Sequence, residues 1–292
     1  MSVLEKFRHY DLEGFRVGRF NLGVNTTFSV YRLGGTLIDA GPSNQWRYVK
    51  GFIQTAPLQQ LLLTHHHEDH SGNAGAIHRL TGVRAQAPSL TANILQRGFA
   101  IPPIQRLLWG SAGRTDAQIL PEKIHIGGED AEAIFTPGHA KDMHCYLLPE
   151  RGWLFSADLY IANYLKLLRV DENVDTLLQS IRTVLSCDFD TILCPHRGVV
   201  ENGKQKLQEK YDYLLNLSSE AQMLQKQGLE LEVITRRLLG KEGAVGILSR
   251  YNFSKRNLIA SCLQVNLPFF LVQSLNRSLA HPLADTLDQS AS

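Results

Sequence analysis

The sequence predicts an α+β protein in which a sheet-rich domain, residues 1–202, is followed by a small all-α domain, residues 203–292. Three observations predict this organisation. Short apolar segments with strand-like patterns alternate with turns and helices through the first two-thirds of the chain. Helical patterns replace them after about Gly203, and the residues that could bind a metal each follow a predicted strand. Because loops at strand ends converge on a rigid frame, we expect the functional site there.

The elements of the first domain are predicted from apolar runs that are bounded by glycine and proline. The strand at 36–40, for example, ends in the turn signal Asp-Ala-Gly-Pro. Two short helices are expected between Pro88 and Pro121, where they would either cover the core or form a lid over the site. The other predicted elements are strands at 27–33, 58–63, 131–136 and 191–194, a hairpin of strands 145–148 and 153–157, and helices from 71–73 to about 80 and at 174–185.

The second domain is predicted to consist of helices at 204–227, 230–239 and 255–263. Residues 203–256 contain ten Lys and Arg against six Asp and Glu. A solvated helical face explains this excess most simply, and a nucleic-acid surface is the alternative. The last dozen residues are expected to form a loose tail.

The composition is that of a soluble globular protein, with 43% hydrophobic and 20% charged residues. A net charge of +2 does not indicate nucleic acid or a membrane as a partner. The four cysteines are scattered without metal-binding or redox spacing, so reduced thiols are expected. The first ten residues are too polar for a signal peptide, and no apolar stretch reaches transmembrane length. These features predict a cytoplasmic protein with no membrane partner.

One motif, H-x-H-x-D-H, decides the functional interpretation; it consists of His65, His67, Asp69 and His70. It follows an apolar run that predicts a buried strand. Two histidines two positions apart point the same way on an extended segment. Neutral imidazole together with carboxylate suits zinc, iron or manganese. His66 would point away from its neighbours, so we expect it to pack or to support a ligand.

Three further candidate ligands follow later strands: His139 in T-P-G-H, Asp158, and His196. Seven such ligands are enough for two divalent metal ions, of which zinc is expected first and manganese or iron are the alternatives. A two-metal site lowers the pKa of a shared water from 15.7 toward roughly 7 and polarises the oxygen of a bound carbonyl or phosphoryl group. No cysteine has a visible base partner, so a covalent mechanism is not supported.

The order of these motifs resembles the metallo-β-lactamase superfamily over about residues 21–200. That resemblance implies an α+β four-layer αββα sandwich with a dinuclear site at one edge. The use of Asp158 where the zinc β-lactamases have Cys is similar to the hydroxyacylglutathione-hydrolase side of the superfamily. The C-terminal region is similar in kind to the helical, winged-helix-like domain of related lactamase-like hydrolases. Carried over, one metal would be held by His65, His67 and His139, the other by Asp69, His70 and His196, and Asp158 would bridge them.

Several positions depart from the family pattern. Arg197 follows the last histidine ligand, where it would either bind an anionic part of the substrate or form an ordinary surface salt bridge. Tyr160, two residues after Asp158, would either donate to a developing oxyanion, as tyrosines do in related lactonases, or pack in the core. His144 replaces a family histidine one position earlier and is expected to be structural.

The leading hypothesis is a metal-dependent hydrolase. A metal-bridging hydroxide would attack an ester, thioester or lactone carbonyl of a small-molecule substrate, and Asp69 would orient the hydroxide or shuttle its proton. The alternative is a single-strand-specific endoribonuclease that uses the same dinuclear site, with single-stranded RNA as its partner. A single-iron dioxygenase and a non-catalytic scaffold are less favoured, and a homodimer would be compatible with the helical edges.

Overall fold

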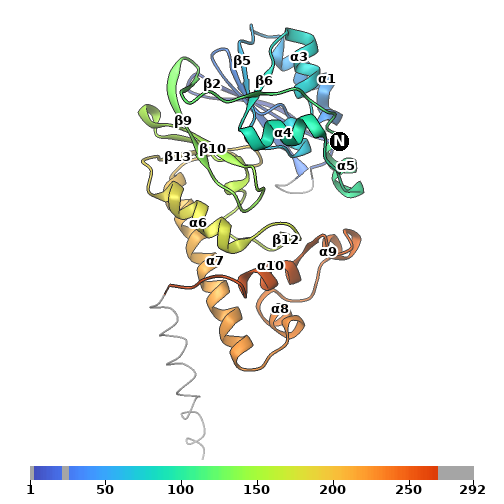
Figure 1. Cartoon of the computed structure of the whole chain (residues 1–292), viewed down its shortest axis with the longest axis vertical. Helices are drawn as coiled ribbons and strands as arrows, with labels where there is room; N and C mark the ends of the chain where they lie inside the picture. The colour runs from blue at the N-terminus through green and yellow to red at the C-terminus, as the bar shows by residue number, and fades with distance from the viewer. Residues whose placement is uncertain (1–2, 22–25, 269–292) are drawn as a thin grey trace, which may run out of the picture. The chain divides into compact units, whose positions relative to one another are not determined.

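The structure is a computed structural model that describes residues 3–21 and 26–268. The predicted C-terminal tail lies outside these residues. Contacts divide the chain into two compact units (Figure 1). Unit 1 comprises Met1–Asn163 and Gln179–Glu209, and unit 2 comprises Tyr164–Leu178 and Lys210–Ser292. The predicted domain boundary at residue 203 stays a prediction. Within the described residues, no helix is long and apolar enough to cross a membrane.

The first sheet of unit 1 has seven strands that pair in chain order. Its first four strands are antiparallel neighbours, whereas β4 to β7 run parallel. Parallel neighbours need a crossover, and helices α1 to α5 lie in these connections. The strands are β1 Val3–His9, β2 Leu12–Gly18, β3 Phe28–Leu33, β4 Thr36–Ile38, β5 Gln60–Leu62, β6 Ala85–Ala87 and β7 Gln118–Ile119, and the helices are α1 Trp46–Ile53, α2 Glu68–Ser71, α3 Ala74–Thr81, α4 Ser89–Arg97 and α5 Pro103–Trp109.

The second sheet has six strands in the order β14-β13-β11-β10-β9-β8. The predicted hairpin is confirmed, because Tyr146 of β10 lies opposite Phe155 of β11 in an antiparallel pair. Strand β11 then pairs parallel with β13, and helix α6 lies in the connection between them. The elements are β8 Ile124–Ile126, β9 Glu129–Phe135, β10 His144–Leu148, β11 Trp153–Phe155, α6 Val174–Leu185, β13 Thr191–Cys194, β14 Gly198–Val200 and α7 Gly203–Lys226.

The two sheets pack face to face through one apolar cluster, and a second cluster joins the first sheet to its helices. Leu62 of β5 belongs to the inter-sheet cluster, together with Tyr146 and Phe155 of the second sheet. Its neighbour Leu61 points the other way and packs with Ile77 of α3, because successive strand residues face opposite sides. Each such side chain contributes about 1.5–3 kcal/mol when fully buried. The predicted αββα sandwich is confirmed (Figure 1).

Besides parts of α6 and α7, unit 2 contains three shorter helices, in agreement with the helical prediction for the C-terminal region, and a sheet of two two-residue strands. Strand β15 Phe253–Ser254 pairs antiparallel with β12 Leu168–Arg169. Ser254 then caps helix α10, since its hydroxyl accepts a hydrogen bond from the Asn257 backbone N–H. The helices here are α8 Leu231–Leu239, α9 Ala244–Leu248 and α10 Lys255–Cys262.

Most predicted elements differ from the observed ones by one to three residues at an end, and one predicted helix is divided in two. The single helix expected from 71–73 to about 80 is two helices, α2 and α3, which meet at Gly72 and Asn73. A Cβ at Gly72 would lie 2.3 Å from the Glu68 carbonyl oxygen and 2.8 Å from the Ser43 backbone nitrogen. Glycine therefore lets the loop after β4 lie directly against the helix that carries the histidine motif.

Candidate metal centre

All seven predicted ligands lie just past the carboxyl ends of strands, and the structure brings them together. Sheet 1 contributes the ligands that follow β5, and sheet 2 contributes those that follow β9, β11 and β13. Their ligand atoms form two groups, within each of which all atoms lie within 4.8 Å of one another. The groups are His65, His67, His139 and Asp158, and Asp69, His70, Asp158 and His196. Their role as ligands stays a prediction that this geometry supports.

The first group is built around Nδ1 of His67. The Nε2 atom of His65 lies 2.9 Å from it, and the Nε2 atom of His139 lies 3.0 Å from it. The rings of His65 and His67 meet edge to face, with centroids 4.5 Å apart. Three ring nitrogens that converge in this way, two of them on almost fully buried residues, form a nitrogen donor set of the kind that zinc prefers.

In the second group, hydrogen bonds on the far side of each ring determine which nitrogen faces the centre. His196 donates from Nδ1 to the Thr27 carbonyl oxygen at 2.8 Å, and His70 Nδ1 lies 2.7 Å from Asp39 Oδ2. The Nε2 atom of each ring therefore points inward, as it does in metal-ligating histidines whose other nitrogen is held by an oxygen. Phe28 packs edge to face against both rings and fixes their planes.

Asp158 is shared between the two groups. Its Oδ1 atom lies 3.3 Å from Nε2 of His70 and 3.3 Å from Nε2 of His196, while Oδ2 lies 3.0 Å from Nε2 of His139. The nearby Asp69 Oδ2 is 3.5 Å from His196 Nε2. One carboxylate thus faces both halves of the centre, as a bridging ligand must.

The residues present fit a pair of divalent ions. The Nε2 atom of His70 and the Oδ1 atom of Asp158 are buried and have no hydrogen-bond partner, although they face each other. Buried polar atoms are normally paired, so two unpaired atoms in one cluster indicate a missing partner. A donor set of imidazole nitrogen and carboxylate oxygen alone suits zinc, manganese or iron.

The electrostatics of the two groups differ. Burial, reinforced by the charge of His70, lowers the pKa of His65 well below its ordinary value, so this ring is uncharged. Burial also acts to lower the pKa of His70, but Asp39, Asp158 and Asp69 together raise it well above its ordinary value. Asp158 is ionised because His196, His139 and His70 outweigh its burial and hold its pKa well below the usual range. The second group therefore attracts positive charge.

Asp39 contacts one of the predicted ligands, although the sequence indicated only a turn at this position. It follows β4 and has a left-handed backbone with φ 58°. Its carboxylate accepts from the Thr64 backbone N–H at 2.8 Å and lies 2.7 Å from Nδ1 of His70. Asp39 thus joins the loop that begins the histidine motif to one of its rings. Its position just past a strand end, like that of the ligands, was the available signal.

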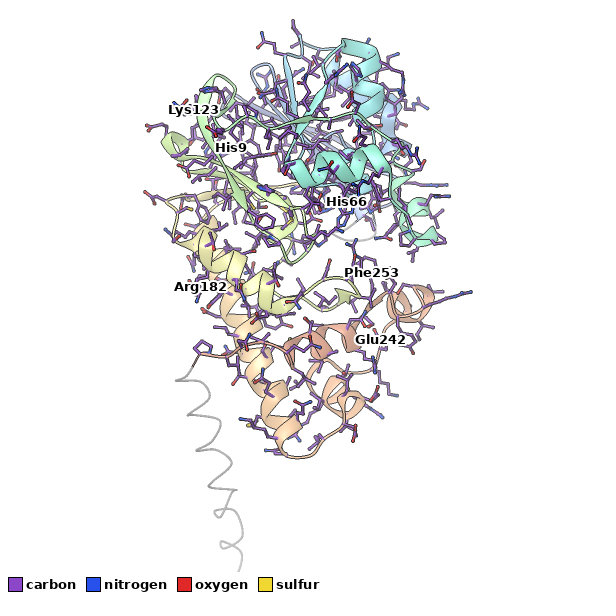
Figure 2. All side chains as sticks on the ribbon, viewed as in Figure 1. His9, His66, Lys123, Arg182, Glu242 and Phe253 are labelled. Carbon is purple, nitrogen blue, oxygen red and sulfur yellow. The ribbon has the colours of Figure 1, made fainter. Side chains whose placement is uncertain are left out.

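His66 takes no part in either group, as expected. Its backbone N–H donates to Asp142 Oδ2 at 2.9 Å, and its Nδ1 lies 2.7 Å from Asp142 Oδ1. Thr91 of α4 donates to the same carboxylate at 2.8 Å. His66 is labelled in Figure 2, and its ring meets Phe99 edge to face. Asp142 therefore ties the histidine motif to the loop that carries His139.

The structure does not place the polar groups of Tyr160 and Arg197 among the ligand atoms. The Tyr160 hydroxyl donates to the side-chain oxygen of Asn163, whose amide donates to Glu209. Burial raises the pKa of Tyr160, so its hydroxyl keeps its proton. Arg197 is exposed and donates from Nε to the Ile161 carbonyl oxygen at 2.9 Å. The predicted oxyanion and substrate roles of these residues stay predictions.

Helix α5 lies beside the centre and adds an aromatic residue, Trp109. The ring of Trp109 is 5.9 Å from the ring of His196 and is 6% exposed. Gln105, one turn earlier on the same face, is also buried, and its Oε1 atom has no partner. The two helices expected between Pro88 and Pro121 are confirmed as α4 and α5. Through Trp109, this segment forms a wall of the metal centre.

Comparison with known proteins places this site in a family context. A family model described as the metallo-beta-lactamase superfamily matches residues 21–196. The chain is 27% identical over 181 residues to an atrochrysone carboxyl ACP thioesterase from Aspergillus fumigatus, which covers 60% of this chain and 51% of that protein. It is 28% identical to a hydroxyacylglutathione hydrolase from Cereibacter sphaeroides, over 47% of each chain. These alignments span about half the length of both relatives.

A solved structure shows the same fold. A beta-lactamase domain protein from Burkholderia ambifaria superposes with a TM-score of 0.67 at 14% sequence identity, and the match covers 89% of this chain and 88% of that one. At this identity the likeness concerns the fold alone. The matched region of the family model contains all seven residues of the two ligand groups.

Proposed function

Because the chain belongs to the metallo-β-lactamase superfamily, we propose that it is a dinuclear metal-dependent hydrolase whose substrates are thioesters. The convergence of seven histidine and aspartate ligands on two adjacent groups that share Asp158 is the observation that carries this proposal. The names of the two relatives support the thioester in preference to other carbonyl substrates. One is a thioesterase, and the other is a hydrolase of hydroxyacylglutathione, which is itself a thioester.

The residues of the two groups would hold one divalent ion each. Two bound ions would supply an acidified water and a Lewis acid for the carbonyl oxygen. Asp69 stands in the first turn of α2, with Oδ2 3.5 Å from His196 Nε2. We assign to its carboxylate the orientation of the attacking water and the transfer of its proton. Hydroxide adds to the carbonyl carbon, the carbon–sulfur bond breaks, and the proton passes to the departing thiolate, so the products are a carboxylic acid and a thiol.

A matched set of substrates tests the proposal. Protein loaded with two equivalents of zinc, manganese or iron is assayed with a hexanoyl thioester of pantetheine, the corresponding oxygen ester and hexanolactone. Thioester hydrolysis above the rate of the metal-free protein is expected. If none of the three metals supports cleavage of the thioester while the protein stays folded, the proposed function is wrong.

The endoribonuclease alternative uses the same ligands and stays a prediction. It differs from the thioesterase in its response to salt. Binding of a phosphodiester chain weakens steeply as the salt concentration rises, because the release of condensed counterions by the protein then gains less free energy, whereas binding of an uncharged acyl pantetheine does not. Cleavage of single-stranded RNA with that salt dependence, in the absence of thioester cleavage, would favour the nuclease.

Trp109 is predicted to contact the acyl part of the substrate. Replacing it with phenylalanine keeps a ring in the wall but reduces its area and removes its N–H group. We expect KM for a benzoyl thioester to rise about threefold to tenfold, since one aromatic contact is worth roughly 0.5–1.5 kcal/mol. Steady-state kinetics with benzoyl and acetyl thioesters measure the effect. Leu107→Ala, on the exposed side of α5, is the control, and an equal change in both variants would contradict the assignment.

A further inference from the structure

Helix α9 and the turn after it expose large apolar side chains in unit 2. Val245, Ile247, Leu248 and Tyr251 are 49%, 59%, 75% and 52% exposed. Val170 is 68% exposed, and its backbone N–H donates to the Asn252 carbonyl oxygen beside Tyr251 at 2.9 Å. We refer to these five residues as the α9 surface. Single exposed apolar residues are ordinary, whereas several of them so close together in the chain point to an interaction site.

The backbone beneath the α9 surface is held firmly in place. Glu242, labelled in Figure 2, accepts from the Lys255 backbone N–H at 2.9 Å and packs against the buried Gly246. The Ser249 hydroxyl bonds to the backbone of Phe253, and the Asn257 amide donates to the Tyr251 carbonyl oxygen at 2.9 Å. Because side-chain hydrogen bonds fix this turn at both ends, the outward direction of its apolar residues is a property of the fold.

Basic residues flank the α9 surface in sequence. Between Val233 and Tyr251 the chain has four basic residues and one acidic residue. The acidic residue is Glu242, whose carboxylate is used inside the unit. Within the described part of the chain, no ion pair involves the four basic residues, and all four are exposed. They are Arg236, Arg237, Lys241 and Arg250. Exposed aliphatic side chains and four exposed basic residues, which have no ion-pair partner among the described residues, therefore lie close together in this part of the chain.

This combination distinguishes between classes of partner. A second copy of the chain would bring like charges together across a two-fold axis, which is unfavourable. Single-stranded nucleic acid binds through aromatic side chains on which its bases stack, whereas four of the five residues here are aliphatic, Tyr251 being the exception. An acidic protein with an apolar face matches both the charge and the aliphatic area.

We propose that the α9 surface docks a small acidic carrier protein that bears the substrate as a thioester on its phosphopantetheine arm. The proposal rests on the proposed thioesterase function, because only a thioester substrate gives such a carrier a reason to bind. It goes further by stating that part of the recognition lies on the carrier and on unit 2, whereas the ligand groups belong to unit 1. A carrier-bound thioester should therefore be a better substrate than the same acyl group on free pantetheine.

The test compares two substrates and two double variants. Leu248→Ser combined with Lys241→Glu alters the α9 surface, and Arg250 is left unchanged because its backbone has φ 51°. Ile119→Ser combined with Lys123→Glu is the matched control on unit 1, where Ile119 is 64% exposed. The substrates are hexanoyl pantetheine and an acidic acyl carrier protein loaded with a hexanoyl group. We expect the α9 variant to lower kcat/KM for the loaded carrier at least about tenfold, equivalent to roughly 1.4 kcal/mol.

Hydrolysis of hexanoyl pantetheine should change less than twofold in both variants, and the control should retain full activity on the carrier. Equal rates for the α9 variant and the unaltered chain with the loaded carrier would overturn the proposal. The proposal would also be overturned if the α9 variant hydrolysed the loaded carrier normally but no longer bound single-stranded RNA or phosphatidylserine vesicles.

Direct binding separates this proposal from the proposed function. If hexanoyl pantetheine is not hydrolysed, the thioesterase assignment fails, yet fluorescence anisotropy of a labelled carrier still tests docking. Binding that weakens about tenfold in the α9 variant supports the surface. Failure of the unaltered chain to bind the carrier at millimolar concentration overturns it.

Discussion

Replacing Asp158 with alanine should remove metal from both halves of the centre and abolish hydrolysis, whereas replacing His67 should affect mainly one half. Asp158 faces His139 with one oxygen and both His70 and His196 with the other. The ring of His67 belongs to the first group, where its Nδ1 atom faces His65 and His139. We therefore expect metal content to fall from two ions per chain toward zero in the first variant and toward one in the second.

The catalytic loss should be large in both variants. Removing one preorganised electrostatic contact typically costs about 10²–10³ in kcat, and we expect Asp158→Ala to reach at least about 10³-fold. Elemental analysis of protein purified without added metal, together with thioester kinetics, measures both effects. Asp190→Ala, an exposed carboxylate before β13, is the control. Equal metal content in the Asp158 variant and the control would contradict the shared-ligand geometry.

Asp39→Asn should weaken the centre although Asp39 belongs to neither group of ligands. Its Oδ2 atom holds Nδ1 of His70 at 2.7 Å, and its Oδ1 atom accepts from the backbone of Thr64 at 2.8 Å. An amide keeps the shape but loses the charge that favours a proton on that nitrogen. Outer partners of this kind usually contribute 10- to 100-fold to metal affinity or activity, so we expect a loss of about 30-fold.

The choice of asparagine separates electrostatics from backbone strain. Asp39 has φ 58°, which asparagine adopts at a lower cost in free energy than alanine. Zinc affinity measured by competition with a chelator should fall in Asp39→Asn while the thermal midpoint of the metal-free protein changes little. Asp39→Ala should lower both quantities. An unchanged zinc affinity in both variants would mean that Asp39 contributes only to the backbone conformation of the turn after β4.

The candidate site was largely predictable because its chemistry lies in a short contiguous motif. His65, His67, Asp69 and His70 lie within six positions, and the other ligands each follow an apolar strand. Asp39 and Asp142 were not predicted as site residues, because a carboxylate that binds a histidine from another loop has no local pattern. Asp39 reaches His70 because β4 pairs with β5, and Asp142 reaches His66 because the two sheets pack face to face.

The fold was predictable in part, and length alone did not decide which elements were found, because the seven-residue strands β1 and β2 were not predicted. The bounds of α6 and β13 agree with the prediction to the residue. Strands β6, β7 and β8 have two or three residues, too few to show an alternating pattern. Helix α1 also gave no prediction, because it has only eight residues and a single apolar stripe interrupted by Arg47 and Lys50. The conformation of these segments is determined by their contacts with the rest of the sheet and with the core, which no local pattern in the sequence records.

Each ligand group takes residues from both sheets of the sandwich, so bound ions would link the two sheets to each other. Such ions bind the native state far better than the unfolded chain, and they raise the free energy of unfolding by about 4 kcal/mol when free metal exceeds Kd a thousandfold. Urea denaturation of chelated and zinc-loaded protein measures this linkage. Metal supply would then set the lifetime of the chain as well as its activity, because proteases and chaperones act on the form that opens.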